Sequence, residues 1–378
     1  MPYSKKALDL HKKLKGKIEV TSRVKVDNMD DLSTIYTPGV GAVCMAIRKR
    51  RNKSWEYTNR GNQVAIVTDG TAILGLGNIG PEAGMPVMEG KSVIFKKFAN
   101  IDAIPLCINT TDPDEIVKFC KHIEPSFGGI NLEDISAPRC FDILKRLEKE
   151  LKIAVFHDDQ DGTAIVTLAA VINACKLTGK KFSDLKVVVN GAGAAGMAIT
   201  RLLLTQKFKD IILLDSISTI YEGRKNLNPY KEKIAKKTNK SKIKGRLEEA
   251  LVGSDIFIGV SKADLVDEGM IRSMNEDPII FAMANPNPEI APDRAYRAGA
   301  SIVGTGRSDY PNQINNALVF PGLFRGLLDS WKKRVTVNMK IAAAKAIAES
   351  VKPTKKKILP SILDKKVVNK IARAIKNN

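Results

Sequence analysis

The sequence predicts an α/β protein built from two units, and three observations support this. Short apolar runs, typical of buried strands, alternate with helical stretches of about a dozen residues, the pattern of parallel strands with crossover helices. The 378 residues of the chain are enough for two hydrophobic cores. A glycine-rich turn follows a strand in the second half and opens a new helix. We therefore expect units over residues 1–161 and 162–322 and a helical segment over 323–378.

The first unit contains four candidate strands separated by helices. One helix should begin at Asp112, because an acidic residue followed by Pro113 suits a first helical turn. Another should run from Ala137 to Leu151 and lead into the last strand. The candidate strands are Val64–Thr68, Ala103–Ile108, Gly129–Leu132 and Ile153–Phe156.

Carboxylates gather where the last two of these strands end. Glu133 and Asp134 follow one strand, and Asp158 and Asp159 follow the next, with Asp161 two residues further on. If the strands are neighbours in a parallel sheet, four carboxylates meet at one edge. Such groups repel one another unless a cation lies among them, and Mg²⁺ and Mn²⁺ prefer oxygen ligands. The sequence predicts a divalent-metal site, although any single acid could instead cap a helix or face solvent.

The second unit begins with the apolar helix Thr163–Leu177, which Gly179 should end. A strand over Leu185–Asn190 then runs directly into Gly191–Gly196, with the pattern Gly-x-Gly-x-x-Gly, and into the helix Met197–Leu204. The glycines permit a tight turn and close approach of the backbone, and the helix N-terminus faces a pyrophosphate. This setting predicts a Rossmann-type dinucleotide-binding unit.

An acidic residue marks the end of the next strand. Ile211–Leu214 leads to Asp215, which can bond a ribose 2′-hydroxyl. Its charge would repel a 2′-phosphate, which favours NAD over NADP. Arg224 and Lys225 follow closely and could reach the same region, so NADP stays possible. A solvated acid at a strand end is the alternative interpretation of Asp215.

The composition excludes several classes of protein. The net charge is +20, but lysines lie along nearly the whole chain without interleaved aromatic residues, so we expect no nucleic-acid partner. No apolar stretch approaches the roughly 20 residues needed to span a bilayer. The N-terminus lacks the features of a secretory signal, so we expect a cytoplasmic location and no membrane anchor. The five cysteines contain no Cys-x-x-Cys pair, and we expect neither disulfide nor zinc site.

Further short motifs occur in a fixed order. They are Ile35–Val40, Thr68–Gly80, Met88–Lys91, Asn131–Ile135, Val155–Ala164, Ala284–Pro286, Thr305–Asn316 and Phe320–Gly322. With these motifs the sequence resembles the malic enzymes of the short prokaryotic type, over nearly its whole length. The resemblance implies oxidative decarboxylation of L-malate to pyruvate and CO₂ with NAD(P)⁺ and Mg²⁺ or Mn²⁺. It also implies a homodimer and a C-terminal segment, broken at residues 353–360, that folds back on the first unit.

The resemblance assigns roles to individual residues. Lys91 matches the general base, Tyr36 matches the general acid, and Asp158 is expected to tune the lysine. Glu133, Asp134 and Asp159 match the metal ligands. The matching substrate contacts are Tyr36, Lys91, Asn285, Asn315 and Asn316, with Arg307 as a weaker candidate. The matching cofactor contacts are Thr163, Gly191, Ala192, Gly193, Ala194, Ala195, Gly196, Asp215 and Asn285.

Without the resemblance, the same residues have plainer interpretations. Lys91 lies in the glycine-flanked stretch Glu89–Ser92, which we expect to be a turn, and a lone lysine is usually solvated. Tyr36 would be a packing residue. A desolvated lysine beside a divalent cation loses basicity, however, and can then accept the proton of the C2 hydroxyl of malate. Between Asn315 and Asn316 the sequence does not choose, and either could instead form a turn or a cap.

Two departures from the family pattern stand out. Ala72 replaces an arginine that longer eukaryotic malic enzymes use to hold the substrate carboxylate, so the asparagines and the backbone of Leu74–Asn78 must take over that work. Asp161 stands where the family usually has His or Gln. It can cap the helix that begins near Thr163, and its charge should tighten metal binding and weaken malate binding.

Two other functions are compatible with the sequence. A malolactic or oxaloacetate-decarboxylating relative would bind malate and NAD but release another product. A basic binding protein that has kept the fold is more remote, because it would not need an acid, a base and metal ligands together.

Overall fold

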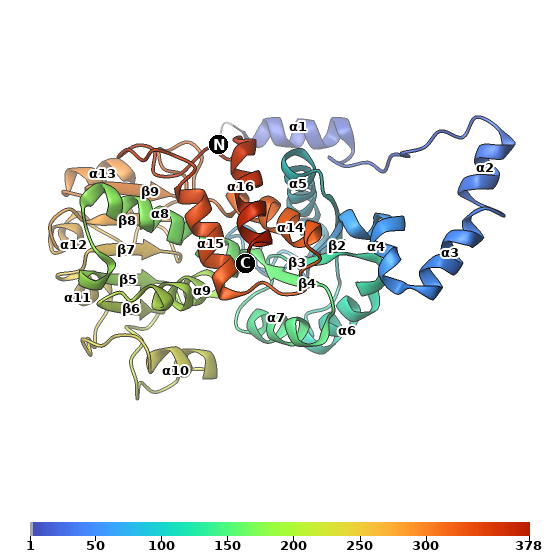
Figure 1. The fold of residues 1–378 in the computed structure, drawn as a ribbon. Helices are drawn as coiled ribbons and strands as arrows, with labels where there is room; N and C mark the ends of the chain where they lie inside the picture. The colour runs from blue at the N-terminus through green and yellow to red at the C-terminus, as the bar shows by residue number, and fades with distance from the viewer. Residues whose placement is uncertain (1–2) are drawn as a thin grey trace.

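Two parallel sheets organise the chain in the computed structural model, which describes residues 3–378 (Figure 1). The first sheet has four strands in the order β2-β1-β3-β4, and the second has five in the order β6-β5-β7-β8-β9. Every pairing is parallel. The strands are β1 (Gln63–Thr68), β2 (Asp102–Cys107), β3 (Gly129–Leu132), β4 (Ala154–His157), β5 (Lys186–Asn190), β6 (Asp210–Leu214), β7 (Ile256–Gly259), β8 (Ile279–Ala282) and β9 (Ile302–Thr305).

Helices connect the strands and cover both sheets, which confirms the predicted α/β architecture. The longer helices are α1 (Ser4–Leu14), α3 (Val40–Lys49), α5 (Pro81–Ala99), α6 (Pro113–Ile123), α7 (Arg139–Glu150), α8 (Thr163–Thr178), α9 (Ala194–Leu203), α14 (Phe320–Asp329), α15 (Val337–Ala348) and α16 (Lys365–Lys376). The short ones are α2 (Met29–Ile35), α4 (Ser54–Tyr57), α10 (Pro229–Ala235), α11 (Leu247–Leu251), α12 (Glu268–Arg272) and α13 (Pro292–Arg297). Among the described residues, none of these helices is long and apolar enough to cross a membrane.

The predicted strands and helix ends of the first unit occur with small shifts. The strand predicted over Ile153–Phe156 is β4, displaced by one residue. Asp112 caps α6, because its carboxylate accepts a hydrogen bond from the backbone N–H of Asp114 at 2.8 Å, and Pro113 occupies the first turn. Gly179 ends α8 with a positive φ of 69°. The sequence predicts these helix ends because a capping residue acts within one turn of the helix.

The stretch around Lys91 is not the turn that its glycines predicted, because it lies inside α5. Met88, Lys91, Phe95 and Ala99 recur at helical spacing and are all buried against the rest of the first unit. Burial of this face outweighs the weak helix propensity of Gly90. The consequence is that Lys91 lies on the buried face of α5.

Of the C-terminal helices, α14 and α16 return to the first unit, as expected, whereas α15 lies against α8 of the second unit. α14 packs against α5 and α16, and α15 packs against α8 and α16. Phe324 joins the core of the first sheet, with its ring centroid 5.4 Å from that of Phe95 and 5.9 Å from that of Phe156. The break between α15 and α16 spans residues 349–364 and includes the predicted stretch.

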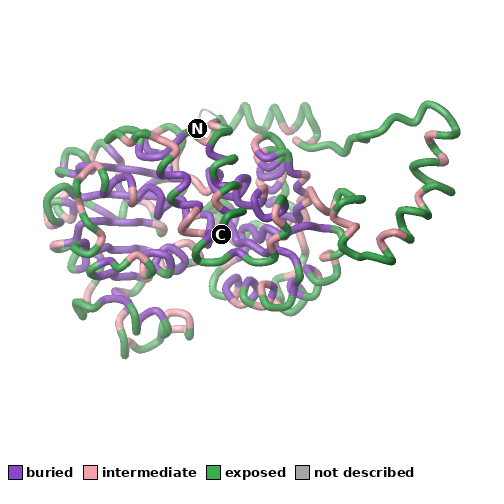
Figure 2. Tube along the Cα trace, viewed as in Figure 1, coloured by how far each residue is buried: buried purple, intermediate pink, exposed green. Residues whose placement is uncertain are grey.

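Buried residues are unevenly distributed along the chain (Figure 2). No residue from 3 to 63 is buried, whereas the strands from Val64 onward are almost wholly buried except for the edge strand β2, which is mostly half-buried. Residues 24–50, which contain α2 and α3 and are named the arm here, project away from both sheets (Figure 1). Among the described residues, no hydrogen bond or ion pair joins residues 25–49 to either sheet.

Candidate active site

The two acid pairs meet at the carboxyl edge of the first sheet, as predicted. β3 and β4 are neighbours, with Leu132 paired to His157, so the residues that follow them lie side by side. One carboxylate oxygen from each of Glu133, Asp134 and Asp159 lies within 4.8 Å of the others. The backbone N–H of Asp134 donates to Asp159 Oδ2 at 2.8 Å, which ties the two strand ends together.

These carboxylates are poorly solvated. Glu133 and Asp134 are 2% and 5% exposed. Burial raises the pKa of Asp134 to about 8, and repulsion from Asp159 adds to this effect. Burial likewise holds the pKa of Glu133 well above its usual range, although Lys91 opposes the shift. Asp134 Oδ2 is buried and has no hydrogen-bond partner among the described residues. A bound cation would satisfy this oxygen and remove the repulsion, so the three residues fit a hard divalent ion.

Lys91 lies beside this group. Its Nζ atom is 2.8 Å from Glu133 Oε1 and donates a hydrogen bond to Asp158 Oδ2. Burial lowers the pKa of Lys91, but Asp158 and then Glu133 more than offset this, so the pKa lies above its ordinary value. Burial raises the pKa of Asp158 to about 6, although Lys91 opposes the shift. The structure therefore brings the predicted base, its predicted tuning residue and a predicted ligand into one buried contact.

The turn after β4 is shaped around Asp158. Asp158–Gly162 form a short π-helical turn that leads into α8. A Cβ atom on Gly162 would lie 1.9 Å from Asp158 Oδ1, so only glycine fits there. The same position would be 3.2 Å from Cβ of Asn316, which places Asn316 against this turn. Asn315 instead caps its own short helix, with Oδ1 accepting from the N–H of Ala317 at 2.8 Å.

Asp161 does not cap α8, contrary to the prediction. No side-chain hydrogen bond caps that helix, because the π-helical turn continues directly into it with helical backbone angles at Gly162. The Asp161 carboxylate instead forms an ion pair with Lys340 of α15 at 2.7 Å. Its charge is therefore already offset, although it lies only two residues from Asp159.

Sequence reasoning missed several polar residues at this edge. Asp69 follows β1, its side chain is fully buried, and its carboxylate lies 2.6 Å from Arg139 Nη2. Asn131 is also fully buried and donates to Glu133 Oε2 at 2.9 Å, which fixes that carboxylate. Asn131 lies two residues before Glu133, so the alternation of a strand could have identified it.

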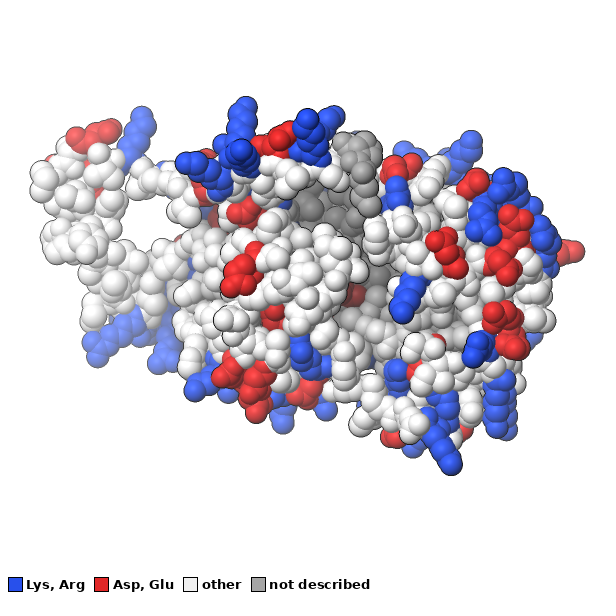
Figure 3. All heavy atoms as spheres, turned by 180° about the vertical axis from the view of Figure 1, so that it is seen from behind, with Lys and Arg blue, Asp and Glu red and all other residues white. Residues whose placement is uncertain are grey.

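Tyr36 is not brought to this cluster within one chain. It ends α2 on the arm, is 68% exposed, and its hydroxyl forms no hydrogen bond among residues 3–378. Most of the large apolar side chains of the arm are also exposed: Val24, Val26, Met29, Leu32, Ile35, Val43 and Met45. In the space-filling view from behind, the arm stands off from the body with few charged side chains on much of its surface (Figure 3).

The glycine-rich turn has the predicted geometry between β5 and α9. Gly191 has a φ of 115°, and a Cβ atom there would lie 2.6 Å from the carbonyl oxygen of Val260. A Cβ atom on Gly196 would lie 1.8 Å from the carbonyl oxygen of Gly191, so both positions require glycine. The space beside Gly193 is open, with α9 beginning at the next residue. This open helix N-terminus suits a pyrophosphate. Thr163, also a predicted cofactor contact, begins α8.

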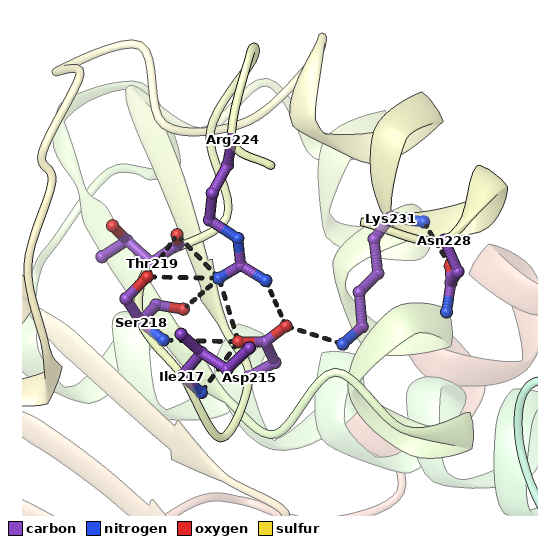
Figure 4. A network of polar contacts seen from close by, with 7 residues as sticks. All are labelled: Asp215, Ile217, Ser218, Thr219, Arg224, Asn228 and Lys231. Carbon is purple, nitrogen blue, oxygen red and sulfur yellow. Dashed lines mark hydrogen bonds and ion pairs between the residues drawn. The ribbon is translucent and has the colours of Figure 1, made fainter. Parts of the chain in front are cut away.

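Asp215 lies at the end of β6, but its carboxylate is already fully engaged (Figure 4). Oδ1 accepts from Arg224 Nη1 at 2.9 Å and from the N–H of Ile217 at 3.0 Å. Oδ2 is 2.6 Å from Lys231 Nζ and also bonds Arg224 Nη2. Burial alone would raise the pKa of Asp215, but Arg224 and Lys231 hold it below its usual range. The predicted repulsion of a 2′-phosphate is therefore weakened, and Lys231 rather than Lys225 is the second cation.

Asn285 lies where the two units meet. A Cβ atom on Gly75 would lie 2.5 Å from the Asn285 carbonyl oxygen, and one on Gly306 would lie 3.0 Å from Asn285 Nδ2. The loop after β1 therefore approaches the edge of the second sheet at this residue. Arg307, the weaker candidate, pairs with Asp309 at 2.6 Å.

The matches to known protein families divide the chain into the same two units as the sheets. Residues 15–148 match the malic enzyme N-terminal domain, and residues 160–378 match the malic enzyme NAD-binding domain. The chain is 54% identical to a bifunctional malic/malolactic enzyme of Bacillus subtilis, over 99% of this chain and 92% of that protein. It is 51% identical to an NAD-dependent malic enzyme of Geobacillus stearothermophilus, over 95% of this chain and 76% of that protein.

Solved structures agree with these sequence matches. The NAD-dependent malic enzyme of Thermotoga maritima superposes with a TM-score of 0.96 at 48% identity, and the match covers 98% of each chain. The malic enzyme of Pyrococcus horikoshii gives a TM-score of 0.94 at 46% identity, over 99% of this chain and 89% of that one. The chain belongs to the malic enzyme family.

Proposed function

We propose that the protein oxidatively decarboxylates L-malate to pyruvate and CO₂ with reduction of NAD⁺ or NADP⁺, in a reaction that depends on Mg²⁺ or Mn²⁺. The observation that carries this proposal is the buried contact of Lys91 with Asp158 and Glu133, where Glu133 also belongs to the group of three carboxylates that fits a cation. A structural ion pair alone would not require the two further acids, Asp134 and Asp159, at the same edge.

Glu133, Asp134 and Asp159 are the proposed metal ligands. When bound there, a divalent cation would stabilise negative charge that develops on the substrate oxygen. Asn131 and the N–H of Asp134 hold two of the ligand carboxylates in place through the hydrogen bonds described above. The three ligands come from the ends of β3 and β4 and the turn after β4, so the parallel pairing of these strands assembles them.

Lys91 is the proposed base for the C2 hydroxyl of malate. The lysine must be neutral before it can accept this proton, and Asp158 is the group in contact that can take the proton it holds. Without a bound cation, Asp158 and Glu133 hold the pKa of Lys91 above its ordinary value, and a cation held by the three ligands would oppose these acids and favour the neutral amine. Asp158 therefore acts through Lys91.

Tyr36 is the proposed acid that protonates C3, and we propose that it acts in the site of a partner subunit. The exposed apolar side chains of the arm cost free energy in water, and a second copy of the chain would cover them. This homodimer would bring the arm of one subunit onto the body of the other. Each site would then combine Lys91 of one chain with Tyr36 of its partner.

The remaining substrate and cofactor contacts follow from the two units. Gly191–Gly196 would receive the pyrophosphate at the start of α9, and Asn285 would contact substrate or nicotinamide at the junction of the units. Asn316 is a better candidate for a substrate contact than Asn315, because the Asn315 side chain already caps a helix. With Asp215 neutralised by Arg224 and Lys231, both NAD⁺ and NADP⁺ are proposed cofactors.

One assay tests the proposal. The protein is mixed with L-malate and Mn²⁺, with and without a chelator, and reduced nucleotide is followed for both cofactors while pyruvate and lactate are measured. We expect chelator-sensitive formation of NADH or NADPH in equal amount to pyruvate. The absence of reduced nucleotide with both cofactors would contradict the proposal. Lactate as main product would support a malolactic reaction instead, which the name of the Bacillus subtilis relative makes the second candidate.

A further inference from the structure

A hollow opens between the two units, and none of the proposed metal ligands or Lys91 lines it. It has a volume of about 890 Å³ and lies between α7 of the first unit and α9 and α10 of the second. α7 and α10 face each other along one side of the molecule (Figure 1), and the ring centroids of Phe141 and Tyr230 are 4.9 Å apart. Neither Gly191–Gly196 nor Asp215 lines this hollow.

Unpaired cations line the hollow. Lys145, Arg201, Lys233 and Lys237 all border it, and none of the four forms an ion pair with any of residues 3–378. Two acids are also present. Asp161 is paired with Lys340, which leaves Glu148 as the free carboxylate. The hollow therefore has an excess of positive charge that nothing within the described chain neutralises.

Apolar side chains form the floor of the same hollow. Phe141, Leu144, Met197 and Ile234 border it and are between 2% and 8% exposed. Arg201 lies over the Phe141 ring, with 5.4 Å from its Cζ atom to the ring centroid. An apolar floor below a cationic rim is complementary to a ligand with an apolar body and an anionic group.

The hollow also contacts the turn that carries Asp158 and Asp159. Gln160 borders it, and its Oε1 atom accepts a hydrogen bond from Arg201 Nη2 at 3.2 Å. Arg201 is thus the group that both faces the hollow and holds the π-helical turn. A ligand that draws Arg201 away from Gln160 would release one support of this turn.

We propose that this hollow, lined by Arg201, Lys145, Lys233 and Lys237, binds an organic anion with an apolar ring or chain and thereby couples to the metal-binding turn. The anionic group lies among the cations, and the apolar part lies on Phe141 and Met197. Binding itself is independent of the proposed malate reaction, whereas the coupling rests on the proposed active site.

Phenyl phosphate combines both features and is the probe for calorimetry with the full-length protein. Saturating NAD⁺ is present throughout, so that the dinucleotide site is filled. We expect phenyl phosphate to bind with a dissociation constant below about 10 mM, as its small size allows. Inorganic phosphate, which lacks the ring, should bind at least about fivefold more weakly. Equal affinity for the two anions would contradict the apolar floor, and no binding of phenyl phosphate would overturn the site.

A charge-reversed pair of variants locates the binding. Lys233→Glu with Lys237→Glu should weaken phenyl phosphate at least about tenfold. Lys236→Glu with Lys209→Glu is the matched control, because it changes net charge equally at exposed lysines that do not line the hollow. Equal weakening in both pairs would mean only general electrostatic attraction and would overturn the proposal.

Reciprocal coupling provides the second measurement. If the turn responds, phenyl phosphate should change the dissociation constant of Mn²⁺ by at least about twofold, and saturating Mn²⁺ should change that of phenyl phosphate by the same factor. Both constants come from calorimetry, so this readout does not depend on turnover. Unchanged Mn²⁺ affinity at saturating phenyl phosphate would overturn the coupling while leaving the binding site supported.

Discussion

The arm and the carboxyl edge of the first sheet differ in almost every physical property. The edge concentrates charged groups where solvent is nearly excluded, and these groups are held by strand pairing and hydrogen bonds. The arm exposes apolar groups and has no polar link to either sheet among the described residues. Buried charge without a counterion and apolar surface without a cover are both incomplete arrangements. Under the proposed function, a cation would complete the first region and a partner chain would complete the second.

Loss of the buried lysine is the largest effect that we predict. Lys91→Met should lower kcat about 10³-fold, because the proposed base is absent. The matched control is Lys97→Met on the same helix, which removes an exposed lysine and should leave kcat within about twofold of the parent. Circular dichroism and thermal unfolding establish that both variants are folded. A normal kcat in Lys91→Met would show that the carboxyl edge of the first sheet does not take part in the reaction through Lys91.

Mixed dimers test whether the arm completes a partner's site. Tyr36→Phe and Lys91→Met are each expected to be inactive as homodimers. When the two are co-expressed, half of the dimers are mixed, and a site with Lys91 from one chain and Tyr36 from the other is intact in each. Activity should then recover to roughly a quarter of the parent value.

The mixed dimer would stay inactive if Tyr36 acted in the site of its own chain. If Tyr36 serves its own chain, every site in the mixed dimer lacks one of the two residues, and no activity returns. Tandem affinity tags allow the mixed dimer to be purified and assayed alone, which should raise the recovered activity to about half.

The apolar surface of the arm can be tested without the chemistry. Ile35→Asp should weaken the dimer at least tenfold, because burial of a large aliphatic side chain contributes about 1.5–3 kcal/mol. Sedimentation velocity across a dilution series measures this, and specific activity should fall at low protein concentration. Leu363→Asp is the control, since Leu363 is 76% exposed but lies outside the arm. If Ile35→Asp and Leu363→Asp dimerise equally, the arm is not the interface.

The edge should show a pH-dependent response to metal. Burial raises the folded-state pKa of Asp134 to about 8, so without a bound cation the contribution of this carboxyl to stability is greatest below its unfolded pKa near 4 and is lost as pH rises toward 8. A cation relieves this loss. The increase in Tm on adding Mn²⁺ should therefore be at least about 2 °C larger at pH 8 than at pH 6. In Asp134→Asn the difference between the two increments should become smaller, with the remainder due to Glu133, and a parent protein with equal increments would contradict the assigned pKa direction.

The two regions also differ in how far the sequence predicts them. Four short apolar runs identified β1–β4, and strand-and-helix alternation predicted that they are parallel, whereas the adjacency of β3 and β4 was a condition that the structure meets. This was enough to bring the acid pairs together. The position of Lys91 inside α5 could not be predicted, because tertiary burial of one helix face decided it against Gly90. The exposure of Tyr36 and the second-unit contacts of Asp215 with Lys231 depend on chain paths that no local pattern encodes.

Substitution of Asp161, which lies two residues after Asp159 beside the carboxyl edge of the first sheet, has the smallest expected effect. From sequence, its charge should tighten metal binding and weaken malate binding relative to Asp161→His. The ion pair with Lys340 offsets that charge, so the Mn²⁺ dissociation constants of the two proteins should differ by less than about threefold. In a Lys340→Met background the carboxylate is unpaired, and the same substitution should then change Mn²⁺ affinity about tenfold. A double-mutant cycle by calorimetry measures this difference. If Asp161→His changes Mn²⁺ affinity equally in both backgrounds, Lys340 does not offset the charge of Asp161. The bound cation alone would then have to balance the negative charge of the carboxylates at the edge.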